Sequence, residues 1–112
     1  MSFAPHTRPQ WEEAEVPKYV VLSNWTDQGV RNAKDTVDRY QTAKQLAESK
    51  GAKFEAHYWT TGSYDFVSVI EAPNGDTVAA LVLQLASGGN IRSTSMRAFT
   101  EDEMQGIIAK MD

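Results

Sequence analysis

The sequence predicts an α+β fold of the ferredoxin-like βαββαβ type: a four-stranded antiparallel sheet, helices on one face, and a short additional helix at the C-terminus. Three observations support this. Strand-like and helix-like segments follow one another in that order. The first and third strand-like segments are apolar at both odd and even positions, as central strands are. A glycine-containing turn joins the second segment to the third.

Composition narrows the class of protein further. The chain has 112 residues, of which 41% are hydrophobic and 23% charged, which is typical of one domain with a core of its own. No apolar run approaches the roughly 20 residues needed to span a bilayer, so we expect no membrane association. The absence of cysteine excludes disulfides and thiolate metal sites and favours a cytoplasmic protein. A net charge of −4, with basic and acidic residues interleaved, argues against nucleic-acid binding.

The chain divides into an arm and a domain. Residues 1–17 contain three prolines and no secretory pattern, so we expect a largely irregular N-terminal arm. Residues 18–112 would form the single ferredoxin-like domain. Trp11 leaves two alternatives open for the arm: a loosely held tail, or a segment anchored on its own or a neighbouring subunit.

The first half of the domain begins with a strand over residues 18–25. Thr26-Asp27 then offers a helix cap. A second cap-like signal at Asp35 predicts a short helical turn, a break, and a main helix that runs to about Ser49.

The second half contains two further strands, over residues 53–60 and 64–72, joined at Gly62-Ser63. Asp76 is expected to cap a helix over residues 77–86. A fourth strand over residues 91–99 follows, and then a C-terminal helix that opens with a capping box.

The sheet has two faces, and helices on one side cover only one of them. We assign a largely apolar set of strand residues to the opposite face, where it is too large to be left in water. We therefore predict a homodimer that packs through the sheet face. The set is Tyr19, Val21, Trp25, His57, Trp59, Phe66, Ile70, Ile91 and Phe99.

Three segments, residues 19–29, 62–67 and 89–99, resemble the GYD domain family, small bacterial proteins related to the dimeric α/β-barrel group. The resemblance implies the ferredoxin-like fold and dimerisation, and it implies no reaction. One position departs from the family's Gly-Tyr-Asp: Ser63 precedes Tyr64, and Gly62 stands one position earlier. Proteins of related fold include cofactor-free monooxygenases, haem enzymes and small-molecule sensors, which is an analogy of fold alone.

His57 is the one histidine in the predicted domain, and alternation puts it on the same face as Trp25 and Trp59. One interpretation makes His57 a general base or a group that orients a ligand. The other makes it a strand histidine at the dimer interface, satisfied by a neighbouring side chain.

The candidate ligand-binding residues are Trp25, His57, Trp59, Tyr64, Asp65 and Arg97. Asp65 either pairs with an arginine and orients a polar ligand, or accepts amide hydrogens from an adjoining loop. Arg97 lies on an otherwise apolar face, where it requires an acidic partner, water or an anionic ligand.

No spacing of ligating side chains suggests a metal site, and nothing in the sequence calls for a cofactor. We therefore expect a small homodimeric protein that binds a small molecule. Two alternatives stay open: a cofactor-independent enzyme that acts on a small aromatic or polyketide-like compound, with His57 as base, or a purely structural or interaction module.

Overall fold

The structure, a computed structural model, describes residues 16–111. Most of the predicted arm, Trp11 included, therefore lies outside the described residues, and the division into arm and domain stays a prediction. Pro17 is the last arm residue described, and its carbonyl accepts the amide hydrogen of Ala72 at 3.1 Å.

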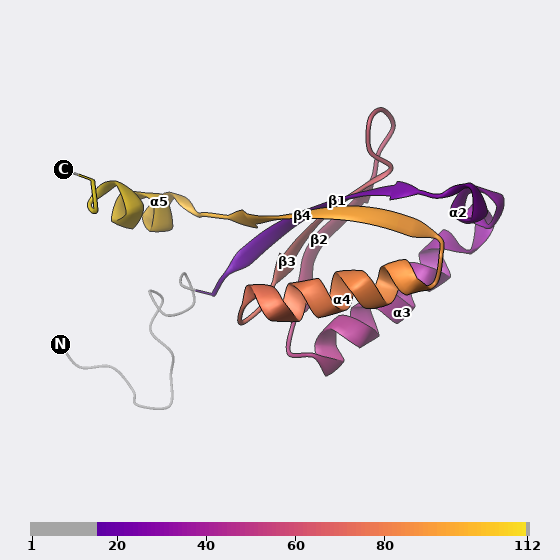
Figure 1. The fold of residues 1–112 in the computed structure, drawn as a ribbon, viewed down its shortest axis with the longest axis horizontal. Coiled ribbons are helices and arrows are strands. Elements are labelled where there is room, and N and C mark those ends of the chain that lie inside the picture. The colour runs from indigo at the N-terminus through magenta and orange to yellow at the C-terminus, as the bar shows by residue number, and fades with distance from the viewer. Residues whose placement is uncertain (1–15, 112) are drawn as a thin grey trace.

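The elements follow the predicted order (Figure 1). The strands pair antiparallel in the order β2-β3-β1-β4, so the first and third strands are central, as predicted. The ferredoxin-like fold class is thereby confirmed. The elements are β1 (Lys18–Trp25), α2 (Asp27–Arg31), the 3₁₀ turn η1 (Ala33–Asp35), α3 (Thr36–Ser49), β2 (Lys53–Trp59), β3 (Phe66–Glu71), α4 (Gly75–Ser87), β4 (Ile91–Ala98) and α5 (Glu101–Ile108).

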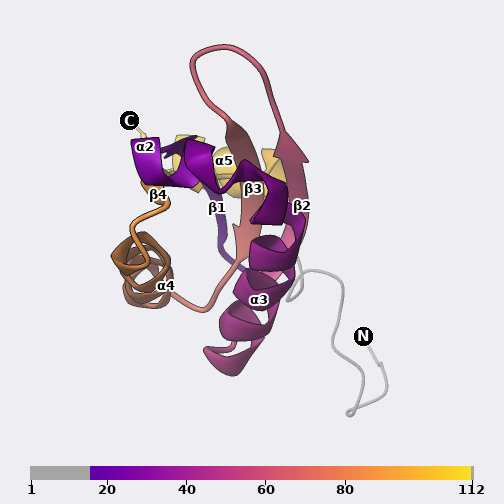
Figure 2. The ribbon, with the colours of Figure 1, turned by 90° about the vertical axis from the view of Figure 1, so that its right-hand side faces the viewer.

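Helices α3 and α4 lie side by side on the same face of the sheet (Figures 1 and 2). The break predicted near Asp35 is confirmed, because α2 ends at Arg31 and η1 separates it from α3. The helix start predicted at Asp76 is wrong: Asn74 caps α4, its Oδ1 accepting the amide hydrogen of Thr77 at 2.9 Å. Asn is as good a cap as Asp, and its earlier position lets the helix begin at Gly75.

The helix-covered face is the reverse of the one predicted. Tyr19, Val21 and Ile70 are buried in one core cluster with Val78 and Leu81 of α4. The members of the assigned set that lie within the strands share this side of the sheet, so their assignment to the opposite face is corrected here. Phe99 lies beyond the end of β4 and is 51% exposed. A central strand that is apolar on both sides does not itself reveal which side the helices cover.

The face away from the helices carries the alternate residues of the central strands. Val20 of β1 pairs with Val69 of β3, and both are half-buried. Lys18, at the start of β1, forms ion pairs with Glu55 at 2.5 Å and Glu71 at 3.2 Å. We call this surface the open face: it has an apolar centre with charged groups at one end.

Strand β2 changes register partway along its length. Phe54 pairs with Ile70 and Ala56 with Val69, so Glu55 is an extra residue in a β-bulge. Simple alternation would put Phe54 and His57 on opposite faces. The bulge instead brings both side chains under the helices.

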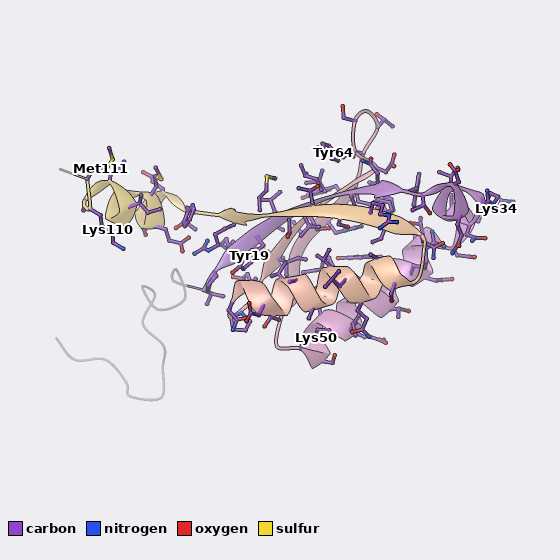
Figure 3. The ribbon with its side chains drawn as sticks, viewed as in Figure 1. Tyr19, Lys34, Lys50, Tyr64, Lys110 and Met111 are labelled. Carbon is purple, nitrogen blue, oxygen red and sulfur yellow. The ribbon has the colours of Figure 1, made fainter. Side chains whose placement is uncertain are left out.

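The C-terminal helix α5 lies beyond the end of β4, away from α3 and α4 (Figure 1). The predicted capping box is present: the Thr100 side chain accepts the Glu103 amide hydrogen at 3.1 Å, and the Glu103 carboxylate accepts that of Thr100 at 2.9 Å. Met104, Ile108 and Met111 remain about half exposed or more. Figure 3 shows Met111 at the far end of this segment.

The core packing predicts a contrast between two leucines of α4. Leu81 is fully buried and Leu83 is 71% exposed. Leu81→Ala should lower the free energy of unfolding by about 2–5 kcal/mol, because it leaves a cavity in the core. Leu83→Ala, the matched control, should change it by less than about 0.5 kcal/mol. Urea unfolding followed by circular dichroism measures both, and equal losses would contradict the packing described.

Candidate ligand-binding cavity

A cavity of about 110 Å³ lies between the helix-covered face of the sheet and helices α3 and α4. Its wall is mostly apolar, but a band of polar side chains crosses it. The apolar residues are Val21, Ala43, Phe54, Phe66, Ile70, Leu81, Val82, Leu85 and Ile91. The polar or titratable residues are Ser23, Thr36, Arg39, Tyr40, His57, Ser68, Asn90 and Ser93.

His57 is the sequence candidate that lines this cavity. Its Nδ1 lies 2.7 Å from the hydroxyl oxygen of Ser68 on the neighbouring strand. Its ring stacks on that of Tyr40, with ring centres 4.0 Å apart and 12° between the planes. Burial lowers the pKa of His57 below its ordinary value. The imidazole is therefore neutral near pH 7 and acts as a hydrogen-bonding group.

The two predicted tryptophans stand beside the cavity wall. Trp59 meets the edge of Tyr40 at 5.7 Å between ring centres, and its Nε1 donates to the Thr36 hydroxyl at 3.0 Å. Trp25 packs edge-on against Phe66, with ring centres 5.2 Å apart. Trp25 and Trp59 therefore support side chains that line the cavity.

Tyr64, Asp65 and Arg97 are not among the residues that line the cavity. Tyr64 is exposed beside the loop between β2 and β3 (Figure 3). The Asp65 carboxylate accepts the amide hydrogen of Trp25 at 2.9 Å, so it binds backbone. Arg97 pairs with Glu103 of its own chain at 2.7 Å, and this pair lowers the pKa of Glu103. The structure thus brings His57 and the two tryptophans together and leaves these three residues elsewhere.

Sequence reasoning missed the polar residues that helix α3 contributes. Arg39 and Tyr40 lie in its first two turns, facing the sheet. Tyr40 fits the three- and four-residue spacing of an apolar helix face, and Arg39 stands one position before it. The available signal was the position of an arginine next to the buried stripe of a helix. From there, its long side chain can extend beneath the helix toward the core.

Two buried nitrogen atoms in this region have no hydrogen-bond partner in the part of the chain that the structure describes. They are Nη2 of Arg39 and Nε1 of Trp25. Arg39 is held by its other terminal nitrogen, Nη1, which donates to the carbonyl of Asn32 at 2.8 Å. A buried donor without an acceptor is costly, so both nitrogens mark places where a water or ligand oxygen is favoured.

The segments that resemble the GYD family meet at one end of the cavity. Thr26 donates from its amide to the Asn90 carbonyl at 3.0 Å and from its hydroxyl to the Gly89 carbonyl at 2.5 Å. Asp65 joins them through the Trp25 amide. Gly29 is buried against this junction, where an added Cβ would stand only 2.0 Å from the Asn90 carbonyl oxygen. We call this junction the motif clasp.

Ser63, the position that departs from the family pattern, lies outside the clasp. Among the described residues, positive φ angles occur only at Gly51, Gly62 and Gly89. Position 63 therefore has a backbone conformation open to any L-residue, and the turn takes its glycine at Gly62 instead.

The cavity chemistry suits binding of a small polar or anionic group. The residues that line it include hydroxyls, an imidazole, an amide and a guanidinium, and no Asp or Glu. Within residues 16–111, no group of three or more His, Cys, Asp or Glu side chains comes together as a metal site would require. The same stretch contains no helix long and apolar enough to cross a membrane.

The fold and the cavity define the class of protein: a single ferredoxin-like unit with a small cavity between its sheet and its helices. The chain belongs to the GYD domain family, whose description matches it over residues 19–108. It is 36% identical over 84 residues to a Thermus thermophilus protein called glutamine synthetase and cystathionine beta-lyase binding protein, and the match covers 74% of this chain and 88% of that one.

Solved structures of regulators share the fold at low sequence identity. The feast or famine regulatory protein of M. tuberculosis, complexed with L-methionine, matches with a TM-score of 0.60 and 15% identity over 84% of this chain. The leucine response regulatory protein of Mycobacterium tuberculosis gives 0.59 and 13% over 88%. The chain spans only 58% and 60% of their respective lengths. At such identity the likeness establishes the fold alone.

The buried imidazole predicts a pH dependence of stability. The unfolded chain takes up a proton at His57 near its ordinary pKa of 6.5, and the folded chain only at lower pH. Between these two pKa values the unfolded state binds more protons, so the free energy of unfolding falls as the pH is lowered. His57→Asn, which keeps a hydrogen-bonding group for Ser68, should remove this component.

Thermal unfolding at about pH 7 and about pH 5 measures the effect, since this interval spans the ordinary histidine pKa. The melting temperature of His57→Asn should fall less between the two pH values than that of the unchanged chain. His6 is common to both proteins, as are all the carboxylates, so equal decreases would show that His57 does not titrate as described.

Proposed function

We propose that this chain is a homodimeric binding protein that holds a small molecule in the cavity between the sheet and helices α3 and α4. The observation that carries the proposal is a cavity of about 110 Å³, partly open to solvent, whose apolar wall carries hydrogen-bonding side chains. Ligand pockets combine a mostly apolar wall with a few polar groups in this way. A small molecule bound there would bury apolar surface and meet these polar groups.

Catalysis has less support than binding. A general base needs a free nitrogen within reach of the proton that it removes. Nδ1 of His57 is hydrogen-bonded to Ser68, which leaves Nε2 as the one ring nitrogen that could act as a base, and a face of the ring is covered by Tyr40. Among the described residues that line the cavity there is also no carboxylate to act as a second acid or base. The cofactor-independent enzyme therefore ranks below the binding protein.

The open face supports the proposed homodimer. Its centre is apolar, with Val20, Leu22, Val67 and Val69 half-buried and Met96 44% exposed. The ion pairs of Lys18 stand at one end of it. An apolar centre with a charged border is typical of an interface between subunits. A second copy of the chain, related by a two-fold axis, would cover it with the same surface.

A protein-interaction module is the second candidate. The Thermus relative favours this function, since its name describes a protein that binds two enzymes. In this chain, α5 offers a surface for such a role, because Met104, Ile108 and Met111 stay exposed on it. Dimerisation and ligand binding are compatible with a partner protein on α5. A cytoplasmic location, favoured by the lack of cysteine, stays a prediction.

The cavity is tested by filling it. Ala43 lines the cavity on α3 and is 8% exposed, so Ala43→Leu places extra methyl groups inside. Protein from its own host should retain a small molecule in native mass spectrometry, and Ala43→Leu should lose it. Ala80→Leu, on the exposed side of α4, is the matched control and should retain it. A co-purified protein partner without any small molecule would favour the interaction module instead.

The dimer is tested by a charge on the open face. Val69 lies on central strand β3, opposite Val20, so Val69→Lys would bury an unpaired charge in the proposed interface. Light scattering after size exclusion should give the mass of two chains for the unchanged protein and of one for Val69→Lys. Leu83→Lys, on an exposed position of α4, should remain dimeric. A monomeric unchanged protein at micromolar concentration would refute the dimer.

A further inference from the structure

We propose that the cavity is selective for a small monoanion that carries a short apolar group, such as a short-chain carboxylate, and that Arg39 binds its anionic end. The inference rests on the proposed function, since it names the chemical class of the molecule held in the cavity.

Arg39 supplies the first argument. Its Nη1 is fixed by the Asn32 carbonyl at 2.8 Å, whereas its Nη2 is buried and meets no acceptor within residues 16–111. A guanidinium offers its donors in a planar fork that fits the two oxygens of a carboxylate. A buried charged donor left unpaired is costly, and an anionic oxygen beside Nη2 removes that cost. The guanidinium is held in position before any ligand arrives.

The charge around the cavity supplies the second argument. The wall is built from β1, β2, β3, β4, α3 and α4, and the described residues on it include one cation, Arg39, and no carboxylate. The cavity therefore favours a negative group through Coulomb attraction. An ammonium group would find no acidic partner on this wall. A simple carboxylate is thus favoured over an amino acid of the same size.

The apolar part of the cavity wall determines the chemistry and size of the rest of the ligand. Phe66, Leu81, Leu85 and Ile91 line the cavity with apolar surface, which suits a hydrocarbon group. A cavity of about 150 Å³ lined by such residues binds benzene, a molecule with six non-hydrogen atoms. The volume here is about 110 Å³. The ligand therefore has about six non-hydrogen atoms or fewer inside the cavity, the size of propionate or butyrate.

Three probes of similar size and different charge test the inference on the full chain: butyrate and butyramide, with six non-hydrogen atoms each, and 2-aminobutyrate, with one more. Binding is followed by the indole N–H signals of Trp25 and Trp59 in ¹H–¹⁵N spectra at constant ionic strength. Trp25 packs against Phe66 of the cavity wall, so its signal reports on occupancy. Butyrate should give a saturable shift. Butyramide should bind at least about tenfold more weakly, as expected for loss of a charged hydrogen bond. 2-Aminobutyrate should also bind more weakly than butyrate, because its ammonium group would be desolvated without an acidic partner.

Arg39→Gln should weaken butyrate binding at least about tenfold. Arg31→Gln is the matched control, because it removes the same charge from the exposed last turn of α2, and it should leave binding unchanged. Circular dichroism establishes whether each variant is folded. If Arg39→Gln does not fold, the contrast between butyrate and butyramide on the unchanged chain still decides.

Unchanged butyrate binding by folded Arg39→Gln would overturn the inference, and so would either of two outcomes on the unchanged chain. The first is butyramide binding as tightly as butyrate. The second is the absence of a saturable shift with any of the three probes. Neither result removes the proposed function, which fails separately if protein from its own host carries no small molecule. A neutral or cationic molecule retained from the host would keep the function and reject the anion.

Discussion

The packing of α4 on the central strands determines the rest of this structure. Val78 and Leu81 are buried against Tyr19, Val21 and Ile70, and this contact decides which face of the sheet is inside. Burial of a leucine or isoleucine side chain is worth about 1.5–3 kcal/mol, so reversing the faces would be costly. Once the inner face is chosen, alternation assigns Val20 and its neighbours to the open face.

The cavity forms where small side chains meet on that inner face. Ser23, Ser68 and Ser93 come from three adjacent strands, and Ala43 of α3 lies across from them. The serines would be costly to bury alone. They are satisfied in pairs: Ser23 and Ser93 lie 2.8 Å apart through their hydroxyl oxygens, and Ser68 binds His57 at 2.7 Å. The cavity thus has a polar floor that is already hydrogen-bonded, whereas Nη2 of Arg39 has no partner among the described residues.

Most of the fold could be predicted from the sequence, since the order of elements along the chain, the break near Asp35 and the capping box at Thr100 all depend on local signals. The orientation of the sheet could not be derived from apolar alternation in the same way, because β1 and β3 are apolar on both sides. A signal was available in charge: Lys18 and Glu71 share a face, and charged side chains favour the side away from the helices. That signal outweighs the aromatic residues that suggested the reverse.

The site was harder to predict than the fold. His57 was singled out correctly as sharing a face with Trp25 and Trp59, but its position beside Phe54 depends on a bulge at Glu55 that no local pattern announces. Arg39 reaches the cavity only through the tertiary packing of α3. Asp65 was open to two interpretations, and the structure gives it a backbone partner, the Trp25 amide.

The motif clasp bears on how proteins of this kind can diverge. Its contacts run from backbone and short side chains to backbone, and Gly29 is required there because the Asn90 carbonyl leaves no room for a Cβ. The residues of the motif clasp hold separate segments of the chain together, whereas Arg39 and Ala43 line the cavity from α3. Proteins that keep the residues of the motif clasp can therefore differ in the ligand that they bind. Ligand preference in such proteins is better sought on α3 than in the residues by which the family is recognised.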